Sequence, residues 1–509
     1  MAFEPVAKEL EVKFAKQLKE ESIPVVMTVA SNEVAISRVI SISANPCVEN
    51  VISNNASVQI DGKIYTKVLV EDVAGNYTNL ENTMTFTIHS MNAEITPEVD
   101  VFSTAYLNSI SSIQASEQAV TFTCNVSAKP ILIAKEKFKY LEHISDLAEQ
   151  KKDEVSYCDL IASTTQEFEL NLELDLPSSV SKVLSVDSRA VLKSVEAGND
   201  IVTLKGEIYS NMLYLTADEE PKLKNQKYIQ EFNHELLANN IVISDLVNAT
   251  LQVGSTDFEL QGEINSAKGT IILKNQLKTN VFVRQNKTFS AIIDAFCPKY
   301  YLNNEFSSYM QQKVTSELLF EKIDGNVVLD EDSPRIDRVL AVCAGNIVLK
   351  SVDKVEGGIN VVGVLTCNVI YKLDDELGTS QSVFTEVPFN LFIKRENQND
   401  LDFVLNIVPK EIEARNKKSK EIDILAEISI NIDTINNESG VILQNIVLGE
   451  RRPINNSALG FYIVPQARDL WDISKALLVP GDVIMEQNPD LQFPFDTPQK
   501  IVIYRQKRL

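Results

Sequence analysis

The feature that most constrains this 509-residue chain is an internal repeat in three copies. A seven-residue block, Ile-Ser-Arg-Val-Ile-Ser-Ile at residues 36–42, recurs in altered form at residues 180–186 and 336–342. Each copy has the order aliphatic, polar, basic, aliphatic, aliphatic, small, aliphatic. Because such a repeat indicates duplication of one supersecondary unit, the sequence predicts three related units in tandem.

A second block follows each copy at nearly constant spacing, at residues 62–70, 206–214 and 363–371. Around it, Val58, Ile60, Gly62 and Ile64 alternate with polar residues, which is the period of a β-strand with one face in a core. Every copy has a glycine at the same position. We expect this glycine to mark a bulge or a close backbone approach inside a strand rather than a hairpin tip.

Further alternating runs at residues 120–126, 258–264 and 422–432 are typical of the strands that close each unit. Residues 134–152, rich in Lys, Glu, Leu and Ala and free of Pro and Gly, predict a helical connector instead. The expected division is a first repeat (1–134), a helical connector (135–166), a second repeat (167–290), a connector with the third repeat (291–450) and a small C-terminal module (455–509).

The C-terminal module has a different pattern from the repeats. A short strand from Phe461 is followed by an amphipathic helix with Asp469 as its N-cap, a second short helix, and a final strand at residues 499–503. This order predicts a βααβ unit. Trp471 is the only tryptophan of the chain, and we expect it to pack in the small core of this module rather than to stack on a sugar.

This module resembles a LysM domain. The resemblance rests on Tyr462-x-Val464, Leu470-Trp471-Asp472-Ile473-x-Lys475, Ile484, Asn488-Pro489 and Ile501-x-Ile503. It implies a docking surface formed by Asp469, Leu470, Trp471, Asp472, Asn488, Pro489 and Asp490. The chain departs from many LysM sequences at Ala467-Arg468-Asp469 and at Thr497-Pro498-Gln499, where Gly-Asp-Thr and Pro-Gly are usual. These departures favour a protein over an N-acetylglucosamine glycan as the ligand.

The repeats, over about residues 10 to 450, resemble the SPOCS (spore-coat structural) repeat, and the whole order resembles SipL-type spore morphogenetic proteins. The resemblance implies a mainly β protein with three tandem β-sandwich-like repeats. It also implies a non-enzymatic scaffold in the mother-cell cytoplasm, at the forespore surface, whose LysM domain engages a SpoIVA-like coat-basement ATPase. The alternative is a peptidoglycan- or N-acetylglucosamine-binding protein of the cell wall or spore cortex.

Charge and hydropathy narrow the possible partners. A net charge of -23 and a pI near 4.7 disfavour nucleic acids and anionic membranes. The N-terminus lacks the pattern of a signal peptide, and no segment is long and apolar enough to span a bilayer, so we expect an unexported protein without membrane insertion. The six cysteines have no CxxC spacing and are expected to be reduced, with a Cys343–Cys367 disulfide as the lesser alternative.

No catalytic constellation is recognisable. The three histidines (His89, His143 and His234) lack metal-ligand spacing, and the chain contains neither a nucleophile elbow nor a phosphate-binding glycine loop. The acidic runs 330–332 and 374–376 lack the spacing of a calcium loop and are expected to be solvated turns. The sequence therefore predicts no catalytic residue, no metal and no cofactor.

Overall fold

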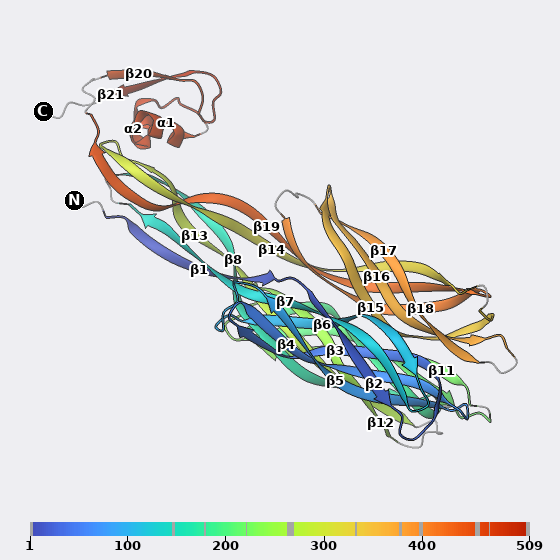
Figure 1. The fold of residues 1–509 in the computed structure, drawn as a ribbon. Helices are drawn as coiled ribbons and strands as arrows, with labels where there is room; N and C mark the ends of the chain where they lie inside the picture. The colour runs from blue at the N-terminus through green and yellow to red at the C-terminus, as the bar shows by residue number, and fades with distance from the viewer. Residues whose placement is uncertain are drawn as a thin grey trace.

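The computed structural model describes residues 4–144, 148–177, 180–219, 221–261, 269–330, 333–375, 379–395, 401–453, 459–467 and 469–504. Nearly all of these residues lie in β-strands, with two short helices close to the C-terminus (Figure 1). This confirms the prediction of a mainly β protein. Within the described ranges, neither helix has the length and apolar character needed to cross a membrane.

The first unit is built from two sheets that share one core. Its strands are β1 (Val6–Gln17), β2 (Glu21–Ala30), β3 (Ile36–Asn54), β4 (Ser57–Asp72), β5 (Tyr77–Met91), β6 (Val101–Ala115) and β7 (Ala119–His143). β7 pairs with β1 and β2 along one edge and with β6 along the other, while β3, β4 and β5 form the second sheet. Alternate side chains of both sheets, such as Met27, Ile60 and Phe122, are fully buried between them.

The second and third units repeat this path. The second contains β8 (Glu149–Asp175), β9 (Val180–Ala197), β10 (Ile201–Thr216), β11 (Leu223–Leu237), β12 (Leu246–Gln261) and β13 (Thr270–Phe296). The third contains β14 (Tyr300–Val328), β15 (Ile336–Val355), β16 (Gly358–Leu373), β17 (Ser380–Lys394), β18 (Leu401–Lys418) and β19 (Glu421–Arg451). Their sheets have the orders β12-β13-β8 with β11-β10-β9, and β14-β19-β18 with β15-β16-β17. In these two units one long first strand, β8 or β14, thus takes the place of β1 and β2 of the first unit.

The predicted helical connector at residues 135–166 is wrong. β7 continues to His143, and β8 begins at Glu149. β8 pairs with β13, with Glu149 opposite Phe296 at one end and Asp175 opposite Thr270 at the other. The local composition favours a helix, but β1 pairs with the end of β7, β13 pairs with β8, and the core behind these strands buries the side chains of Tyr140, Leu141 and Val155. The second unit therefore begins about twenty residues earlier than expected, and the third begins at Tyr300.

The recurrent glycine is a close backbone approach, as predicted. Gly62, Gly206 and Gly363 lie opposite Phe86, Phe232 and Phe389 in antiparallel pairs. A Cβ added to these glycines would lie 2.4, 2.7 and 2.5 Å from the respective phenylalanine ring. Each ring covers the bare backbone of its partner glycine, and the other neighbouring strand has a register shift at or beside each glycine.

The three units pack around a common axis through equivalent side chains. Leu69, Leu213 and Ile370 occupy the same position in the three copies of the second block, and each is at most 1% exposed. They form one cluster with Ile40 and Leu184, which share a position in the first block. The repeats are consequently arranged with approximate threefold symmetry rather than as separate beads.

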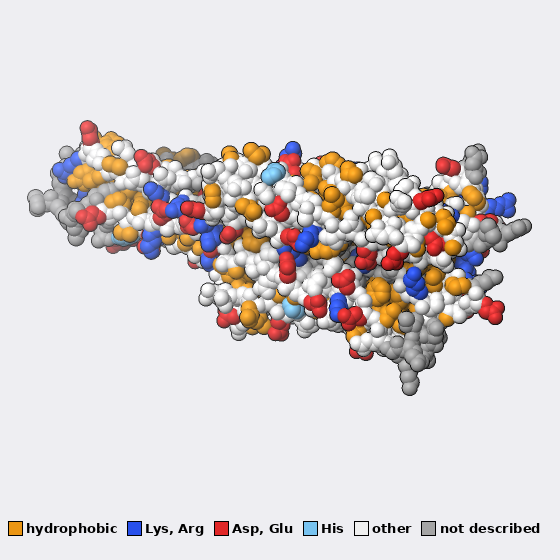
Figure 2. Space-filling model, turned by 60° about the horizontal axis from the view of Figure 1, so that its bottom comes forward, with side chains coloured by type: hydrophobic (Ala, Val, Ile, Leu, Met, Phe, Trp, Pro, Cys, Tyr) orange, Lys and Arg blue, Asp and Glu red, His pale blue; other side chains and the backbone are white. Residues whose placement is uncertain are grey.

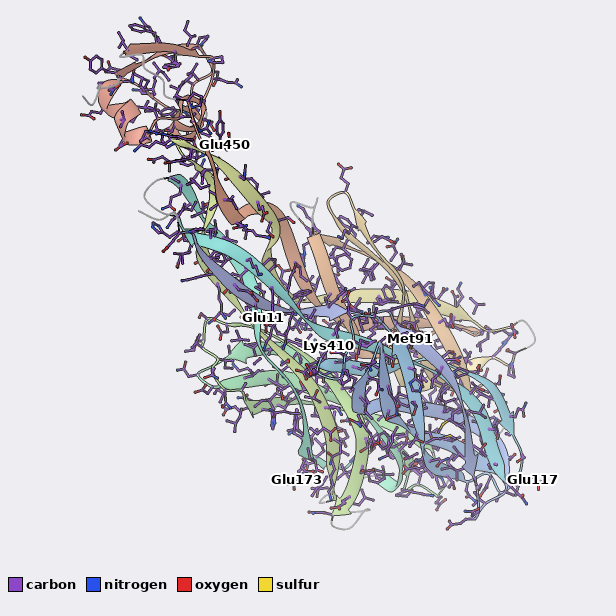
Figure 3. All side chains as sticks on the ribbon, turned by 60° about the vertical axis from the view of Figure 1, so that its left-hand side comes forward. Glu11, Met91, Glu117, Glu173, Lys410 and Glu450 are labelled. Atoms are coloured by element: carbon purple, nitrogen blue, oxygen red, sulfur yellow. The ribbon has the colours of Figure 1, made fainter. Side chains whose placement is uncertain are left out.

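Beyond this body, three antiparallel strand pairs extend together as a stem toward the C-terminal module (Figure 1). They are the outer parts of β1 with β7, of β8 with β13, and of β14 with β19, the first and last strands of each unit. Leu141, Ile292 and Leu443, one from each unit, are buried where these pairs meet. Figure 3 shows Glu450 near the module and Glu117 at the opposite end of the molecule.

The interior contains an ion pair and all the cysteines of the chain. At the base of the stem Arg284 of β13 pairs with Asp433 of β19 at 2.9 Å, both being nearly inaccessible. All six cysteines are buried, and Cys343 and Cys367 are not joined, so the alternative of a disulfide between them is wrong. The surface instead carries Lys, Arg, Asp and Glu side chains interspersed with apolar ones on the face shown in Figure 2.

Candidate docking surface of the C-terminal module

The C-terminal module consists of β20 (Leu459–Val464), α1 (Leu470–Leu477), α2 (Gly481–Gln487) and β21 (Gln499–Tyr504). β20 and β21 form an antiparallel pair, with Leu459 opposite Tyr504 at one end and Val464 opposite Gln499 at the other. Ile473 of α1, Ile484 of α2 and Ile501 of β21 are fully buried at the centre of its core. The helices lie between the two-stranded sheet and the stem (Figure 1), so the module has one face toward the rest of the chain and one face away from it.

Asp469 begins α1 as its N-cap, as the sequence predicts. Its Oδ1 accepts a hydrogen bond from the backbone N–H of Asp472 at 3.0 Å, which satisfies one of the free donors of the first turn. Its Oδ2 accepts from Nζ of Lys151, at 2.6 Å, on β8 of the stem. The Lys151 ammonium group, together with these backbone donors, holds the pKa of Asp469 below its ordinary value.

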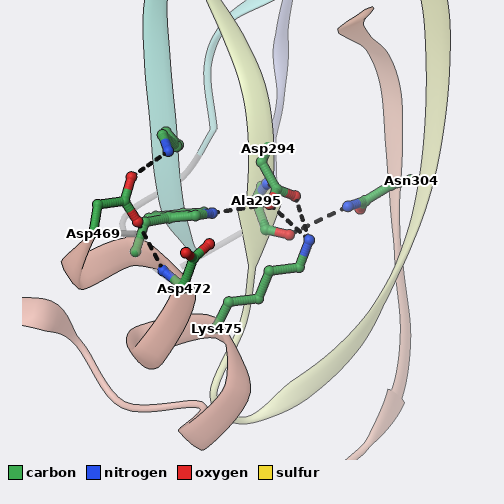
Figure 4. Close-up of polar contacts among 8 residues, drawn as sticks. Asp294, Ala295, Asn304, Asp469, Asp472 and Lys475 are labelled. Carbon is green, nitrogen blue, oxygen red and sulfur yellow. Dashed lines mark hydrogen bonds and ion pairs between the residues drawn. The ribbon is translucent and has the colours of Figure 1, made fainter. Parts of the chain in front are cut away.

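Trp471 makes the most specific contact between the module and the stem. Its indole Nε1 donates a hydrogen bond to Oδ2 of Asp294 at 2.9 Å, and its ring lies 5.2 Å from the ring of Phe296. Both partners belong to the end of β13. Lys475, one turn further along α1, places its Nζ 2.6 Å from the same Asp294 carboxylate (Figure 4).

This position of Trp471 corrects the expectation that it packs in the core of the module. That core is filled by other apolar residues, including Leu470, Phe493 and Phe495. The indole lies on the opposite side of α1 from Ile473 and covers the tip of the stem instead. An amphipathic tryptophan suits this place, because its ring packs on Phe296 while its N–H reaches a carboxylate.

The other predicted docking residues divide into two groups. Asn488 is a brace inside the module: its Nδ2 donates to the carbonyls of Ile484 and Val502 at 2.9 Å each, and its Oδ1 accepts from the N–H of Val502 at 2.8 Å. Pro489 and Asp490 follow it on the surface. The structure thus brings Asp469 and Trp471 together against the stem, whereas the contacts of Asn488 are with α2 and β21. Arg468 lies outside the described residues.

The face of the module away from the stem carries an apolar patch that the sequence analysis missed. We call it the outer patch: Leu459, Phe461, Ile463 and Tyr504, which are 44–77% exposed. Leu459 pairs with Tyr504 and Phe461 with Val502 across the two strands, so these side chains share one face of the sheet. Lys500 adds a positive charge, with its Nζ 4.6 Å from the centre of the Phe461 ring. Alternating apolar residues at 459, 461 and 463 are the signal that could have indicated the patch.

The three histidines lie on three different strands, β5, β7 and β11. His234 stacks on Phe168 with 3.8 Å between ring centres, His143 lies within 3.4 Å of the Gln150 amide, and His89 is on β5. Across the described ranges, no three His, Cys, Asp or Glu side chains converge as a metal site would require. The acidic runs 330–332 and 374–376 fall partly outside those ranges.

One segment of the third unit matches a known protein family. Residues 335–415, which include β15, β16, β17 and most of β18, match the family model described as SipL, SPOCS domain. This segment is SipL-like. Proteins of this family act in sporulation through contacts with other proteins rather than through catalysis. No curated protein and no solved structure matches the chain.

The family match covers one of the three units, and the structure shows what the others have in common with it. β9, β10, β11 and β12 of the second unit follow the same sheet path as the matched strands, as do β3, β4, β5 and β6 of the first. The recurrent glycine of the matched segment, Gly363, has its counterparts at Gly62 and Gly206.

Proposed function

We propose that this chain is a spore-coat morphogenetic scaffold that binds a coat-basement protein through its C-terminal module. The supporting observation is the outer patch, an exposed apolar surface at the far end of a long body of three joined units. Clustered exposed apolar side chains of this kind are typical of protein interfaces. The module is taken to be LysM-like, and the partner to be a SpoIVA-like ATPase at the forespore surface.

The position of Trp471 assigns different roles to the two faces of the module. Asp469, Trp471 and Lys475 are engaged by Lys151, Asp294 and Phe296 of the same chain, so they fix the module on the stem. The partner then meets the outer patch, where the cation of Lys500 lies over the Phe461 ring. We expect the partner to present an apolar surface with an acidic side chain opposite Lys500.

The same contacts weigh against the glycan alternative. A sugar bound beside α1 would compete with Asp294 for the indole N–H of Trp471 and with Lys151 for Asp469. The amide of Asn488 is fully used in bonds to backbone groups of the module. The polar groups of Trp471, Asp469 and Asn488 are thus already engaged within the chain.

The test is a comparison of two ligands for the full chain in one calorimetric assay. We expect saturable binding of the purified basement ATPase and no heat from chitin oligomers at millimolar concentration. Binding of chitin oligomers without binding of the ATPase would overturn the proposal and would favour the wall- or cortex-binding alternative.

A further inference from the structure

The axis around which the three units pack contains a cavity of about 490 Å³. Its walls come from all three units, with Ser43 on β3, Asp187 on β9 and Cys343 on β15 at equivalent positions of the repeat. Its volume falls in the range of small-molecule sites, about 300–1,000 Å³. Since every unit contributes a wall, the cavity exists only in the assembled body.

The walls of the cavity are held by hydrogen bonds from one unit to the next. Lys67 of β4 donates to the carbonyls of Val186 at 3.0 Å and Thr256 at 2.7 Å in the second unit. Asn211, at the equivalent position of β10, donates to the carbonyl of Val342 in the third unit at 3.1 Å. These bonds fix the shape of the cavity before any ligand enters.

One charged group on the wall has a nitrogen without a hydrogen-bond acceptor. Arg189 of β9 is enclosed by protein, and the surface that it retains faces the cavity. Its Nη1 is buried with no hydrogen-bond partner among the described residues. Burial lowers the pKa of Arg189 and the carboxylates of Asp187 and Glu411 oppose this shift, but a guanidinium stays protonated in proteins and its Nη1 still needs an acceptor.

The third unit makes room for this guanidinium. The residue equivalent to Arg189 in the strand pairing is Asn45 in the first unit and Asn346 in the third, where Gly345 precedes it at a register shift of β15. Asn45 donates its Nδ2 to the carbonyl of Gly254 at 2.9 Å. A Cβ at Gly345 would lie only 2.8 Å from Nη1 of Arg189, so the glycine leaves the space that the guanidinium occupies.

The charged side chains around Arg189 indicate which kind of ligand group its guanidinium would bind. Inside the cavity lie the cations Lys67 and Arg189 and one carboxylate, Asp187, whereas the other acidic lining residues, Glu81 and Asp257, are exposed. Among the described lining residues, Arg189 Nη1 is the buried polar atom that lacks an acceptor. Leu107, Val253 and Pro409 contribute apolar wall beside these groups.

We propose that this axial cavity binds a small organic molecule through one carboxylate group, which accepts hydrogen bonds from Arg189. A carboxylate matches the planar fork of a guanidinium and supplies one negative charge. The apolar wall accommodates the remainder of the molecule. Ligand binding would stabilise the three-unit body, because the ligand touches walls from every unit.

Thermal unfolding of the full chain tests this with benzoate and its neutral isostere benzamide as probes, at constant ionic strength. Benzoate at tens of millimolar should raise Tm by about 2 °C or more, and benzamide should not. In Arg189→Met the rise should vanish, while it should persist in Lys193→Met, which removes a surface cation paired with Glu207 and Glu231. An equal rise with benzamide, a rise retained in Arg189→Met, or a rise with inorganic phosphate alone would contradict the proposal.

A second measurement needs no variant. In crystals of the unaltered chain grown with 4-bromobenzoate, the anomalous bromine signal should appear in the axial cavity with the carboxylate at Arg189. A cavity that holds only water under these conditions would overturn the proposal.

Discussion

The indole N–H of Trp471 donates to the carboxylate of Asp294, 2.9 Å away, although the two residues are 177 positions apart in the chain. This bond joins the C-terminal module to the end of the second unit. It places the only tryptophan of the chain at the junction, where its fluorescence reports whether the module is seated.

Asp294→Ala should loosen the module from the stem. The change removes the acceptor of both Trp471 and Lys475, and charge-assisted bonds of this partly exposed kind contribute about 1–3 kcal/mol together. The emission of Trp471 should shift to the red as the indole meets water. The exposed Asp257→Ala serves as control and should leave the spectrum unchanged; an unchanged spectrum in Asp294→Ala would contradict the role of this contact.

Acid should release the C-terminal module from the stem. The pKa of Asp469 is lowered mainly by Lys151, so its contribution is present above the ordinary aspartate value of about 3.9 and is lost as pH falls through the lowered value. A fluorescence titration of Trp471 should therefore show release below about pH 4. In Lys151→Met the midpoint should move to higher pH, because Asp469 then takes up its proton more readily. An identical midpoint would show that the ion pair does not hold the module.

The axial cluster should contribute strongly to stability. Leu213→Ala deletes a side chain that is 1% exposed and meets equivalent residues of the other units, so we expect a loss of about 2–5 kcal/mol in the free energy of unfolding. Chemical denaturation measures the change. Leu237→Ala, at a leucine that is 78% exposed, should change it by less than about 0.5 kcal/mol. Similar losses in both variants would argue against packing of the units around an axis.

The recurrent glycine should not tolerate a methyl group. In Gly206→Ala the new Cβ would lie 2.3 Å from the carbonyl oxygen of Val191 and 2.7 Å from the Phe232 ring, so we expect destabilisation by about 1–3 kcal/mol. Gly254→Ala, on β12 in the other sheet of the same unit, is the matched control, since its Cβ would meet nothing nearer than 3.5 Å. Comparable melting temperatures for the two variants would refute the close approach.

Part of this structure could be predicted from local patterns. The repeated blocks identified three units, the alternation of Val58, Ile60 and Ile64 identified strands, and Asp469 identified the start of α1. These features depend on neighbours in sequence: side-chain period, a cap within one turn, and a glycine that recurs at one position.

The rest depends on partners distant in sequence. Residues 135–166 have helix-favouring composition, yet 135–143 continue β7 and 149–166 belong to β8, which pairs Glu149 with Phe296. Nothing near Trp471 indicates that Asp294 accepts its N–H. The packing of the three units around an axis also depends on partners distant in sequence. The repeat predicts that Leu69, Leu213 and Ile370 are equivalent, but it does not predict that they pack in one cluster. Such pairings are set by global packing rather than by local propensity.

The central claim, that the outer patch binds the coat-basement protein, is tested most directly by affinity measurements on two matched variants of the full chain. Ile463→Ser alters the patch and Leu237→Ser alters an equally exposed residue of β11, the two side chains being 77% and 78% exposed. Calorimetric titration with the SpoIVA-like ATPase should show affinity reduced at least about tenfold in Ile463→Ser and unchanged in Leu237→Ser. Equal affinities for both variants and the unaltered chain would contradict the account.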